Sequence, residues 1–111
     1  MEISLIQQAV REAKEAAYEA ADHFFKTKLG GKDQYACGFA WVNIHGIKGN
    51  TKLGKRMKAA GLDKDYSGAY SIWNPSALGT QCMSTKEAGA EACARVLCAY
   101  GFRAYAGSRA D

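Results

Sequence analysis

Proline is almost absent from this sequence, and long hydrophobic runs are absent altogether. The 111-residue chain has one proline, and no apolar run approaches the roughly 20 residues that a membrane-spanning helix needs. Glu2 stands where a secretory signal would begin with basic residues, so no signal peptide is expected. With 48% apolar residues, the composition is that of a folded chain. We therefore expect one domain, residues 1–111, in the cytoplasm and without a membrane partner.

The cysteines and histidines lack the spacing of metal sites. No two of the four cysteines form a CxxC pair; they are Cys37, Cys82, Cys93 and Cys98. Their small and apolar surroundings predict buried thiols in a reducing compartment, and neither a metal nor a cofactor is expected. His45 has no acidic neighbour in sequence closer than Asp33 and Asp63, so no general base and no catalytic residue is assigned. A binding module is favoured over an enzyme, which stays open as a third class.

Acidic residues are missing from one long stretch. None occurs between Asp33 and Asp63, whereas five basic residues do: Lys48, Lys52, Lys55, Arg56 and Lys58. Elsewhere the two signs nearly balance, so this stretch accounts for the net charge of +4. Local positive charge beside glycines favours phosphate or another anion as a ligand.

Apolar periodicity predicts three helices and three strands. The helices are expected at 2–28, 51–60 and 84–100, the strands at 35–45, 69–74 and 102–106, and a loop at 62–68. The order α-β-α-β-α-β predicts an α/β domain, with α+β as the alternative, in which a three-stranded sheet packs with the long N-terminal and the C-terminal helix. Asn50 is expected to cap the middle helix, Ser84 and Glu87 to form a capping box, and Gly101 to end the last helix.

The N-terminal helix is predicted to be unusually long. At 27 residues it would extend about 40 Å, more than a compact domain of this size needs. Its buried stripe includes Ala13, Ala17 and Ala20, which are small enough for another helix to approach closely. We therefore expect a homodimer formed through this helix.

The strand at 35–45 alternates between an aromatic face and a face of small residues. The aromatic face carries Tyr35, Phe39, Trp41 and His45. Aromatic stripes on strands belong more often to a core, so the favoured prediction is that the N-terminal helix covers this face, although the opposite face also lets a helix lie close. The alternative is an open face, shared with Arg103 and Tyr105, on which nucleic-acid bases stack.

The basic stretch contains the spacing GxxxxGK, from Gly49 to Lys55. In a Walker A loop this spacing cradles phosphates and is followed by Ser or Thr, which binds magnesium. Arg56 occupies that position, the second glycine falls inside a predicted helix, and no later apolar strand ends in aspartate, so nucleotide hydrolysis is not expected. Two interpretations stay open: an anion site at a helix N-terminus, or the solvated face of a short amphipathic helix.

These patterns give a set of candidate ligand residues. The candidate phosphate contacts are Lys48, Asn50, Lys52, Lys55 and Arg56; the candidate stacking groups are Trp41 and Tyr105; His45 and Arg103 are further candidate contacts. A charge of +4 is modest for duplex binding, so a short single strand or a nucleotide is the expected ligand. The alternative is a structural or protein-interaction protein that dimerises through the helix 2–28 and binds no small ligand.

Four segments, DQYACGFAWVNIHG, GNTKLGKRMKAAG, SIWNPS and KEAGAEACARVL, together resemble small uncharacterised proteins of tailed phages, particularly marine ones. The likeness extends over nearly the whole chain and implies the cytoplasm of a phage host, but no particular activity. The closing segment, KEAGAEACARVLCAYGFRAYAG, is also similar to the second half of peptidoglycan-binding SPOR domains. The predicted first half does not follow the strand–helix–strand order of that domain.

Overall fold

The computed structural model describes residues 1–32, 36–65, 67–80 and 82–111. In chain order its elements are α1 (Ile3–Thr27), β1 (Gly38–His45), α2 (Lys52–Ala59), β2 (Asp63–Lys64), β3 (Tyr70–Trp73), α3 (Met83–Ala99) and β4 (Arg103–Ala110). The three predicted helices and three predicted strands are all present near their expected positions. The last strand is longer than predicted, because the C-terminal tail continues it to Ala110.

The strands form one antiparallel sheet of four, in the order β2-β3-β1-β4. The prediction of three strands is wrong, because Asp63 and Lys64 pair with Ser71 and Tyr70 inside the segment that was expected to be a loop. Two residues are too few to show a period in the sequence. The fold is therefore α+β, and its order is α-β-α-β-β-α-β instead of the predicted α-β-α-β-α-β.

From β1 onward, the order strand–helix–strand–strand–helix–strand gives a split β-α-β arrangement. The first half of the chain does contain a strand–helix–strand order, formed by β1, α2 and β2, and the prediction that it lacks one is wrong. Connectivity of this kind describes a fold and assigns no function.

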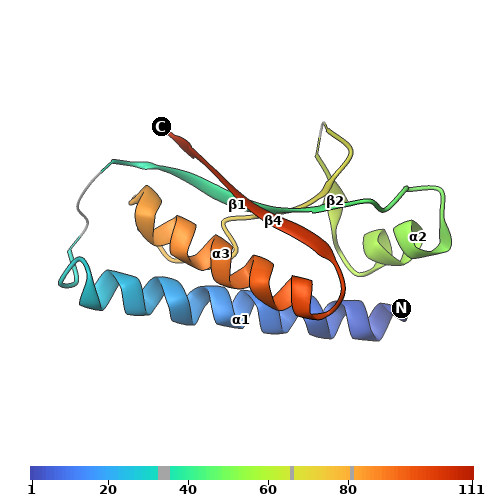
Figure 1. Ribbon diagram of the computed structural model, residues 1–111, viewed down its shortest axis with the longest axis horizontal. Helices are drawn as coiled ribbons and strands as arrows, with labels where there is room; N and C mark the ends of the chain where they lie inside the picture. The colour runs from blue at the N-terminus through green and yellow to red at the C-terminus, as the bar shows by residue number, and fades with distance from the viewer. Residues whose placement is uncertain (33–35, 66, 81) are drawn as a thin grey trace.

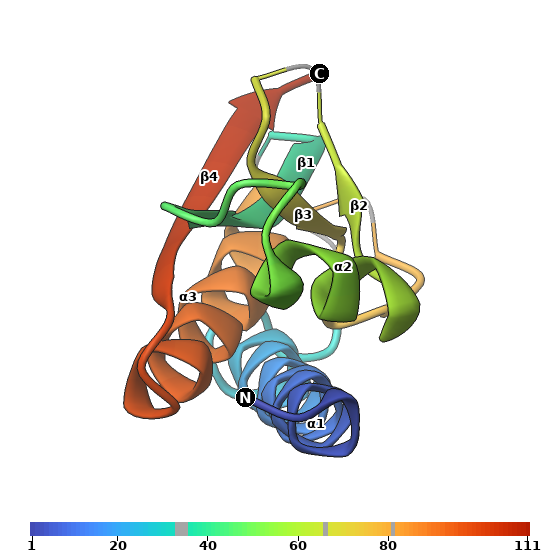
Figure 2. The same ribbon diagram turned by 90° about the vertical axis from the view of Figure 1, so that its right-hand side faces the viewer.

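Both long helices lie on the same side of the sheet (Figures 1 and 2). α3 packs against β1 and β4, and α1 runs alongside α3. The side of β1 that faces them carries Ala40, Val42 and Ile44, each at most 1% exposed. The helices thus lie on the face of small residues, and the favoured prediction that a helix covers the aromatic face is wrong.

Small residues bring α1 and α3 close together. Ala13 and Ala17 of α1 have no exposed surface. A Cβ atom at Gly89 of α3 would lie only 3.1 Å from the carbonyl oxygen of Ala17 and 2.8 Å from Cβ of Ser76. Ala13 and Ala17 are therefore covered within the chain, whereas the homodimer through this helix stays a prediction.

Two of the predicted helix caps are also wrong. Thr51, rather than Asn50, caps α2, and its hydroxyl oxygen accepts a hydrogen bond from the backbone N–H three residues later, at 3.1 Å. α3 begins one residue before Ser84, so Ser84 and Glu87 form no capping box. Gly101 follows α3 with a φ of 96°, the left-handed conformation expected of a glycine that ends a helix.

The four cysteines are free, but only two of them are buried. Burial raises the pKa of the Cys93 thiol to about 12, and Cys82 is equally enclosed. Cys37 and Cys98 are exposed, so the prediction of buried thiols is wrong for these two. Within the described ranges, no three His, Cys, Asp or Glu side chains are grouped so that they could hold a metal ion. Nor does any helix in the described part of the chain combine the length and apolar character of a membrane span.

Candidate functional site

The side of the sheet that points away from the helices carries aromatic and cationic side chains. Side chains alternate along a strand, so the neighbours of the buried residues of β1 point outward, together with their partners on β3 and β4. These outward residues are Phe39, Trp41, Asn43, His45, Ser71, Trp73, Arg103, Tyr105, Gly107 and Arg109. We call this surface the open face. Trp73 and Tyr105 are 59% and 57% exposed there, and among the described residues no helix lies over it.

Three aromatic rings gather at one end of the open face. Trp41 and Trp73 are opposite each other on β1 and β3, and their rings are stacked at an angle of 3° with centroids 5.7 Å apart. The Phe39 ring centroid lies 5.6 Å from that of Trp73. Gly107 is opposite Trp41 on β4, where a Cβ atom would come within 2.5 Å of the indole Nε1. A glycine at this position therefore lets Trp41 lie over β4 and support the more exposed Trp73.

Two cations lie next to Phe39. The Nζ atom of Lys86 is 5.4 Å and the guanidinium carbon of Arg109 is 5.9 Å from its ring centroid, within the range of cation–π attraction. Lys86 reaches this place from α3; it is only 7% exposed, and its ammonium group donates a hydrogen bond to the Gly38 carbonyl oxygen at 2.9 Å. Its role was not predicted, because nothing in a helical pattern shows that one lysine reaches the sheet.

The other end of the open face holds His45, Arg103 and Tyr105. The ring centroids of His45 and Tyr105 are 5.6 Å apart, and Arg103 is opposite His45 in the β1–β4 register. The structure thus brings four of the predicted ligand residues onto one surface: Trp41, His45, Arg103 and Tyr105. Tyr35, which was predicted to share this strand face, lies outside the described residues.

A polar side chain occupies the centre of the open face. Asn43 lies opposite Ser71 of β3 and opposite Tyr105 of β4. Its Oδ1 atom is buried and has no hydrogen-bond partner among the residues that the structure describes. A buried acceptor without a partner is rare and costs about 1–3 kcal/mol of folding free energy. Asn43 therefore retains an unused hydrogen-bonding group among aromatic side chains.

This unused group leads to a prediction about stability. The substitution Asn43→Leu is expected to raise the free energy of unfolding by about 1 kcal/mol, because leucine has a similar shape and lacks the unpaired acceptor. Urea denaturation followed by circular dichroism measures the change. The same substitution at the exposed Asn50 should change stability by less than about 0.5 kcal/mol. A loss of stability in Asn43→Leu would show that Oδ1 makes a stabilising contact.

A second cationic surface lies beside β2. Lys55 and Lys58 of α2 and Lys64 of β2 line a hollow of about 620 Å³, together with Asp63 and Tyr70. The Nζ atom of Lys64 is 5.5 Å from the Tyr70 ring centroid. We call this surface the basic hollow. Lys64 was not among the predicted site residues, because its segment was expected to be a loop outside the basic stretch.

The predicted phosphate contacts do not all reach the basic hollow. Lys55 lines it, whereas Lys48 and Asn50 line an adjoining hollow. Lys52 is exposed on the first turn of α2. Arg56 turns instead to the start of the chain, where its guanidinium lies 3.7 Å from the carboxylate of residue 2 and donates a hydrogen bond to the carbonyl oxygen of residue 1 at 3.3 Å. An acidic group thus already neutralises part of the charge of Arg56.

The second glycine of the GxxxxGK spacing is required for packing. A Cβ atom at Gly54 would lie 2.2 Å from the carbonyl oxygen of Lys48 and 2.8 Å from Cα of Gly49. The carbonyl oxygen of Gly54 accepts a hydrogen bond from the Tyr70 hydroxyl at 2.9 Å. Gly54 lies inside α2, as the sequence indicated. Close contact between α2 and the preceding loop is sufficient to explain the glycine spacing.

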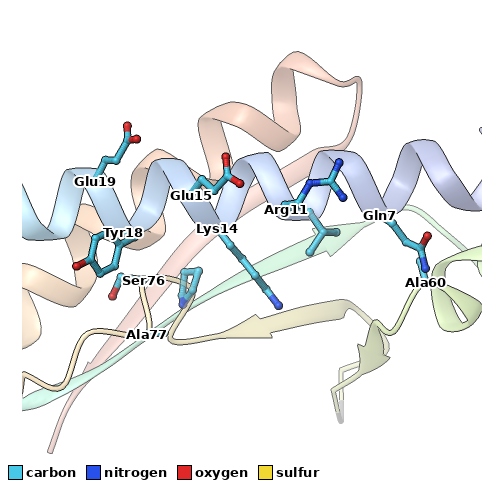
Figure 3. A pocket seen from close by; sticks show the side chains of 11 residues that line it. Gln7, Arg11, Lys14, Glu15, Tyr18, Glu19, Ala60, Ser76 and Ala77 are labelled. Atoms are coloured by element: carbon cyan, nitrogen blue, oxygen red, sulfur yellow. The ribbon is translucent and has the colours of Figure 1, made fainter.

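A third hollow, of about 540 Å³, lies between α1 and the segment that follows β3. Figure 3 shows the Tyr18 ring extending from α1 to lie next to Ser76, while Lys14 leaves the same side of the helix further along it. Tyr18 is 51% exposed, so part of this surface of α1 is apolar and in contact with solvent.

The open face differs from the other two surfaces in combining stacking groups, cations and an unpartnered polar atom. The basic hollow offers charge without exposed aromatic rings, and the hollow beside α1 offers one exposed tyrosine. Comparison of the chain with protein-family models, with curated proteins and with solved structures finds no match.

Proposed function

We propose that this protein binds single-stranded nucleic acid across the open face, without catalysis. One observation carries the proposal: Trp73 and Tyr105 are more than half exposed on a sheet surface that no described helix covers. Large aromatic side chains are costly to leave in water, and an exposed cluster of them marks a binding surface. Bases stack on such side chains in many single-strand-binding sheets, at about 1–3 kcal/mol per base.

The length of the open face favours a strand over a single nucleotide. Phe39 and His45 are six residues apart on β1, which corresponds to about 20 Å at roughly 3.3 Å per residue. Rings lie along this whole distance: Phe39 at one end, then the pair Trp41 and Trp73, then Tyr105 opposite Asn43, and the His45 ring at the other end, 5.6 Å from that of Tyr105. A mononucleotide would contact one end only, whereas a strand of several nucleotides would contact both.

Cations beside the stacking groups would bind the phosphates. Arg103 and Arg109 project from β4 at opposite ends of the open face. Lys48, on the loop that follows β1, and the lysines of the basic hollow extend the positive charge beyond the strand end. A net charge of +4 supports binding to a single strand, which has a lower charge density than a duplex.

Fluorescence anisotropy with labelled eight-nucleotide DNA strands tests the proposal. Binding should be measurable at low salt, should weaken steeply as salt is added, and should exceed binding to a duplex of the same length. Absence of binding at low salt would refute it. Binding of peptidoglycan fragments in place of oligonucleotides would also refute it, and would assign the open face to the ligand class that the SPOR resemblance implies.

The basic hollow leads to a separate prediction on salt dependence. The double substitution Lys55→Ala and Lys64→Ala should lower the slope of log K against log salt by about 1.4, since each phosphate contact of a single strand contributes about 0.7. Titrations at four salt concentrations measure the slope. Lys28→Ala with Lys32→Ala removes the same charge from exposed positions beyond the end of α1 and serves as the control. Equal slopes in the two double variants would exclude the basic hollow from the binding path.

A second candidate function is that of a protein-interaction module that forms a homodimer through α1. It is supported by the hollow beside Tyr18 and by Ile3 and Leu5, which are 37% and 39% exposed near the start of α1. Light scattering at high protein concentration distinguishes a monomer from a homodimer. A strict monomer would rule out this second candidate and leave the first unaffected.

We propose the cytoplasm as the compartment in which the protein acts, and the cytoplasm of a host if the chain is phage-encoded. All four cysteines are free thiols, which supports a reducing compartment. The resemblance to tailed-phage proteins stays a prediction.

A further inference from the structure

We propose that Cys37 and Cys82 form a site of reversible oxidation, at which a peroxide joins the two thiols in a disulfide. One observation carries the proposal: the two residues lie directly opposite each other in an antiparallel β-bridge, although they are far apart in the sequence. Both are free thiols in the structure. The inference uses no residue of the open face, so it stands or falls independently of nucleic-acid binding.

The hydrogen bonds around the two cysteines show which kind of bridge they form. The Met83 N–H donates to the Ala36 carbonyl oxygen at 3.0 Å, so this bond joins the neighbours of the cysteines rather than the cysteines themselves. The carbonyl oxygen of Cys37 accepts instead from the Asp111 N–H, also at 3.0 Å, on the side of β4. Cys37 and Cys82 are therefore a non-hydrogen-bonded pair, the kind in which opposite residues of an antiparallel sheet come closest together.

This arrangement meets the geometric requirement of a disulfide. The Cα atoms of a non-hydrogen-bonded pair are about 4.5 Å apart, and disulfides join residues whose Cα atoms are about 4.4–6.8 Å apart. Opposite side chains leave the same face of the sheet with Cβ atoms about 4.5–5.5 Å apart, whereas a disulfide needs about 3.5–4.5 Å. A movement of about 1 Å is therefore enough to bring the two sulfurs into bonding distance.

The exposure of the two thiols sets the order of the reaction. Cys37 is exposed, whereas Cys82 is only 1% exposed, so a peroxide reaches Cys37 first. The Cys37 thiol and hydrogen peroxide give a sulfenic acid and one water. The Cys82 sulfur then attacks the Cys37 sulfur; the S–S bond forms as the S–O bond breaks, and the hydroxyl leaves with the Cys82 proton as a second water. Two thiols thus lose two electrons to one peroxide.

The other two cysteines lack this arrangement. Cys93 and Cys98 both lie on α3, five residues apart, where their side chains point about 140° away from each other. Neither is opposite a cysteine in the described strand pairs. Cys98 is nevertheless exposed, as Cys37 is. It is therefore an internal control, namely an accessible thiol without a second thiol to trap its sulfenic acid.

A disulfide at this site would fasten α3 to the sheet. Cys82 immediately precedes α3, and Lys86, one turn further on, already donates a hydrogen bond to the Gly38 carbonyl oxygen at 2.9 Å. The covalent bond would also close a long loop in the unfolded chain and lower its conformational entropy. We therefore expect oxidation to raise the melting temperature by about 10 °C.

Peptide mapping under non-reducing conditions tests the proposal. Trypsin places each cysteine on a peptide of its own: 33–48, 65–86, 87–95 and 96–103. After hydrogen peroxide treatment of dilute protein and alkylation of the remaining thiols, we expect peptides 33–48 and 65–86 to be joined within one chain, and dithiothreitol to separate them. Peptide 96–103 should carry a sulfinic acid instead, which dithiothreitol does not remove.

Two variants complete the test, since Cys37→Ser and Cys98→Ser each remove one exposed thiol. Peroxide should raise the melting temperature of the unmodified protein and of Cys98→Ser by about 10 °C, and should produce no such rise in Cys37→Ser. An equal rise in Cys37→Ser would overturn the proposal. So would linkage of Cys37 to another cysteine, a disulfide formed only between two chains, or a stable sulfinic acid at Cys37.

Discussion

Trp73→Ala combined with Tyr105→Ala is expected to weaken single-strand binding by about 30-fold or more. Each of the two side chains can stack one base, and loss of such a stack costs about 1–3 kcal/mol. The fold should survive, because these are the two most exposed large apolar side chains in the described chain, at 59% and 57%. Anisotropy titration at low salt measures the loss, and thermal unfolding checks the fold.

Tyr18→Ala is the matched control for this experiment. Tyr18 is also an aromatic residue, is 51% exposed, and lies on α1 rather than on the open face. Its removal should leave oligonucleotide affinity within about twofold of the unmodified protein, as expected for a surface position away from the site. If Tyr18→Ala weakens binding as much as the double variant does, the strand binds along α1 and the open face is the wrong surface.

The largest expected effect on stability comes from Gly54→Ala, at about 3 kcal/mol or more. The new methyl group would lie 2.2 Å from the carbonyl oxygen of Lys48, so the helix and the loop must separate. Overpacking against backbone cannot be relieved by rotation of a side chain, and it costs at least 1–3 kcal/mol in known cases. The same separation would strain the hydrogen bond from Tyr70 to the Gly54 carbonyl oxygen. Urea denaturation measures the loss.

Gly79→Ala is the control for this substitution. A Cβ atom at Gly79 would meet no atom of the described residues within 4 Å, and the backbone there is not left-handed. Its stability should stay within about 0.5 kcal/mol of the unmodified protein. Similar stability of the Gly54 and Gly79 variants would mean that the loop before α2 yields easily, and the GxxxxGK spacing would then need another explanation.

Much of the fold follows from local patterns, whereas its layering depends on two elements far apart in sequence. The alternation in residues 38–45 predicts a strand with one face of small residues and one aromatic face. Both faces are apolar enough for a helix to pack on, so polarity alone does not show which one is covered. The two helices that cover the small-residue face pack on each other through small residues, since Ala17 of α1 and Gly89 of α3 lie in close contact. Neither residue is near β1 in sequence.

The candidate site was also predictable only in part, because some of its residues follow from local alternation and others from long-range contacts. Trp41, His45, Arg103 and Tyr105 meet because β1 and β4 pair in the register that alternation implies. Other residues depend on contacts that local sequence does not encode. Lys86 reaches the sheet from a helix, Lys64 belongs to a two-residue strand, and Glu2 pairs with Arg56 across 54 positions of the chain. Long-range pairing of this kind has no period or motif to reveal it.

The position of β4 has a consequence for handling the protein. It forms one edge of the described sheet, so the outer backbone groups of its eight residues pair with no other described strand. Such an edge is a template on which further chains can add as strands and aggregate, and charged side chains oppose this. Arg103 and Arg109 supply that charge on β4. Variants that neutralise both arginines to test phosphate binding would therefore lose colloidal stability as well, and their affinities should be measured at low protein concentration.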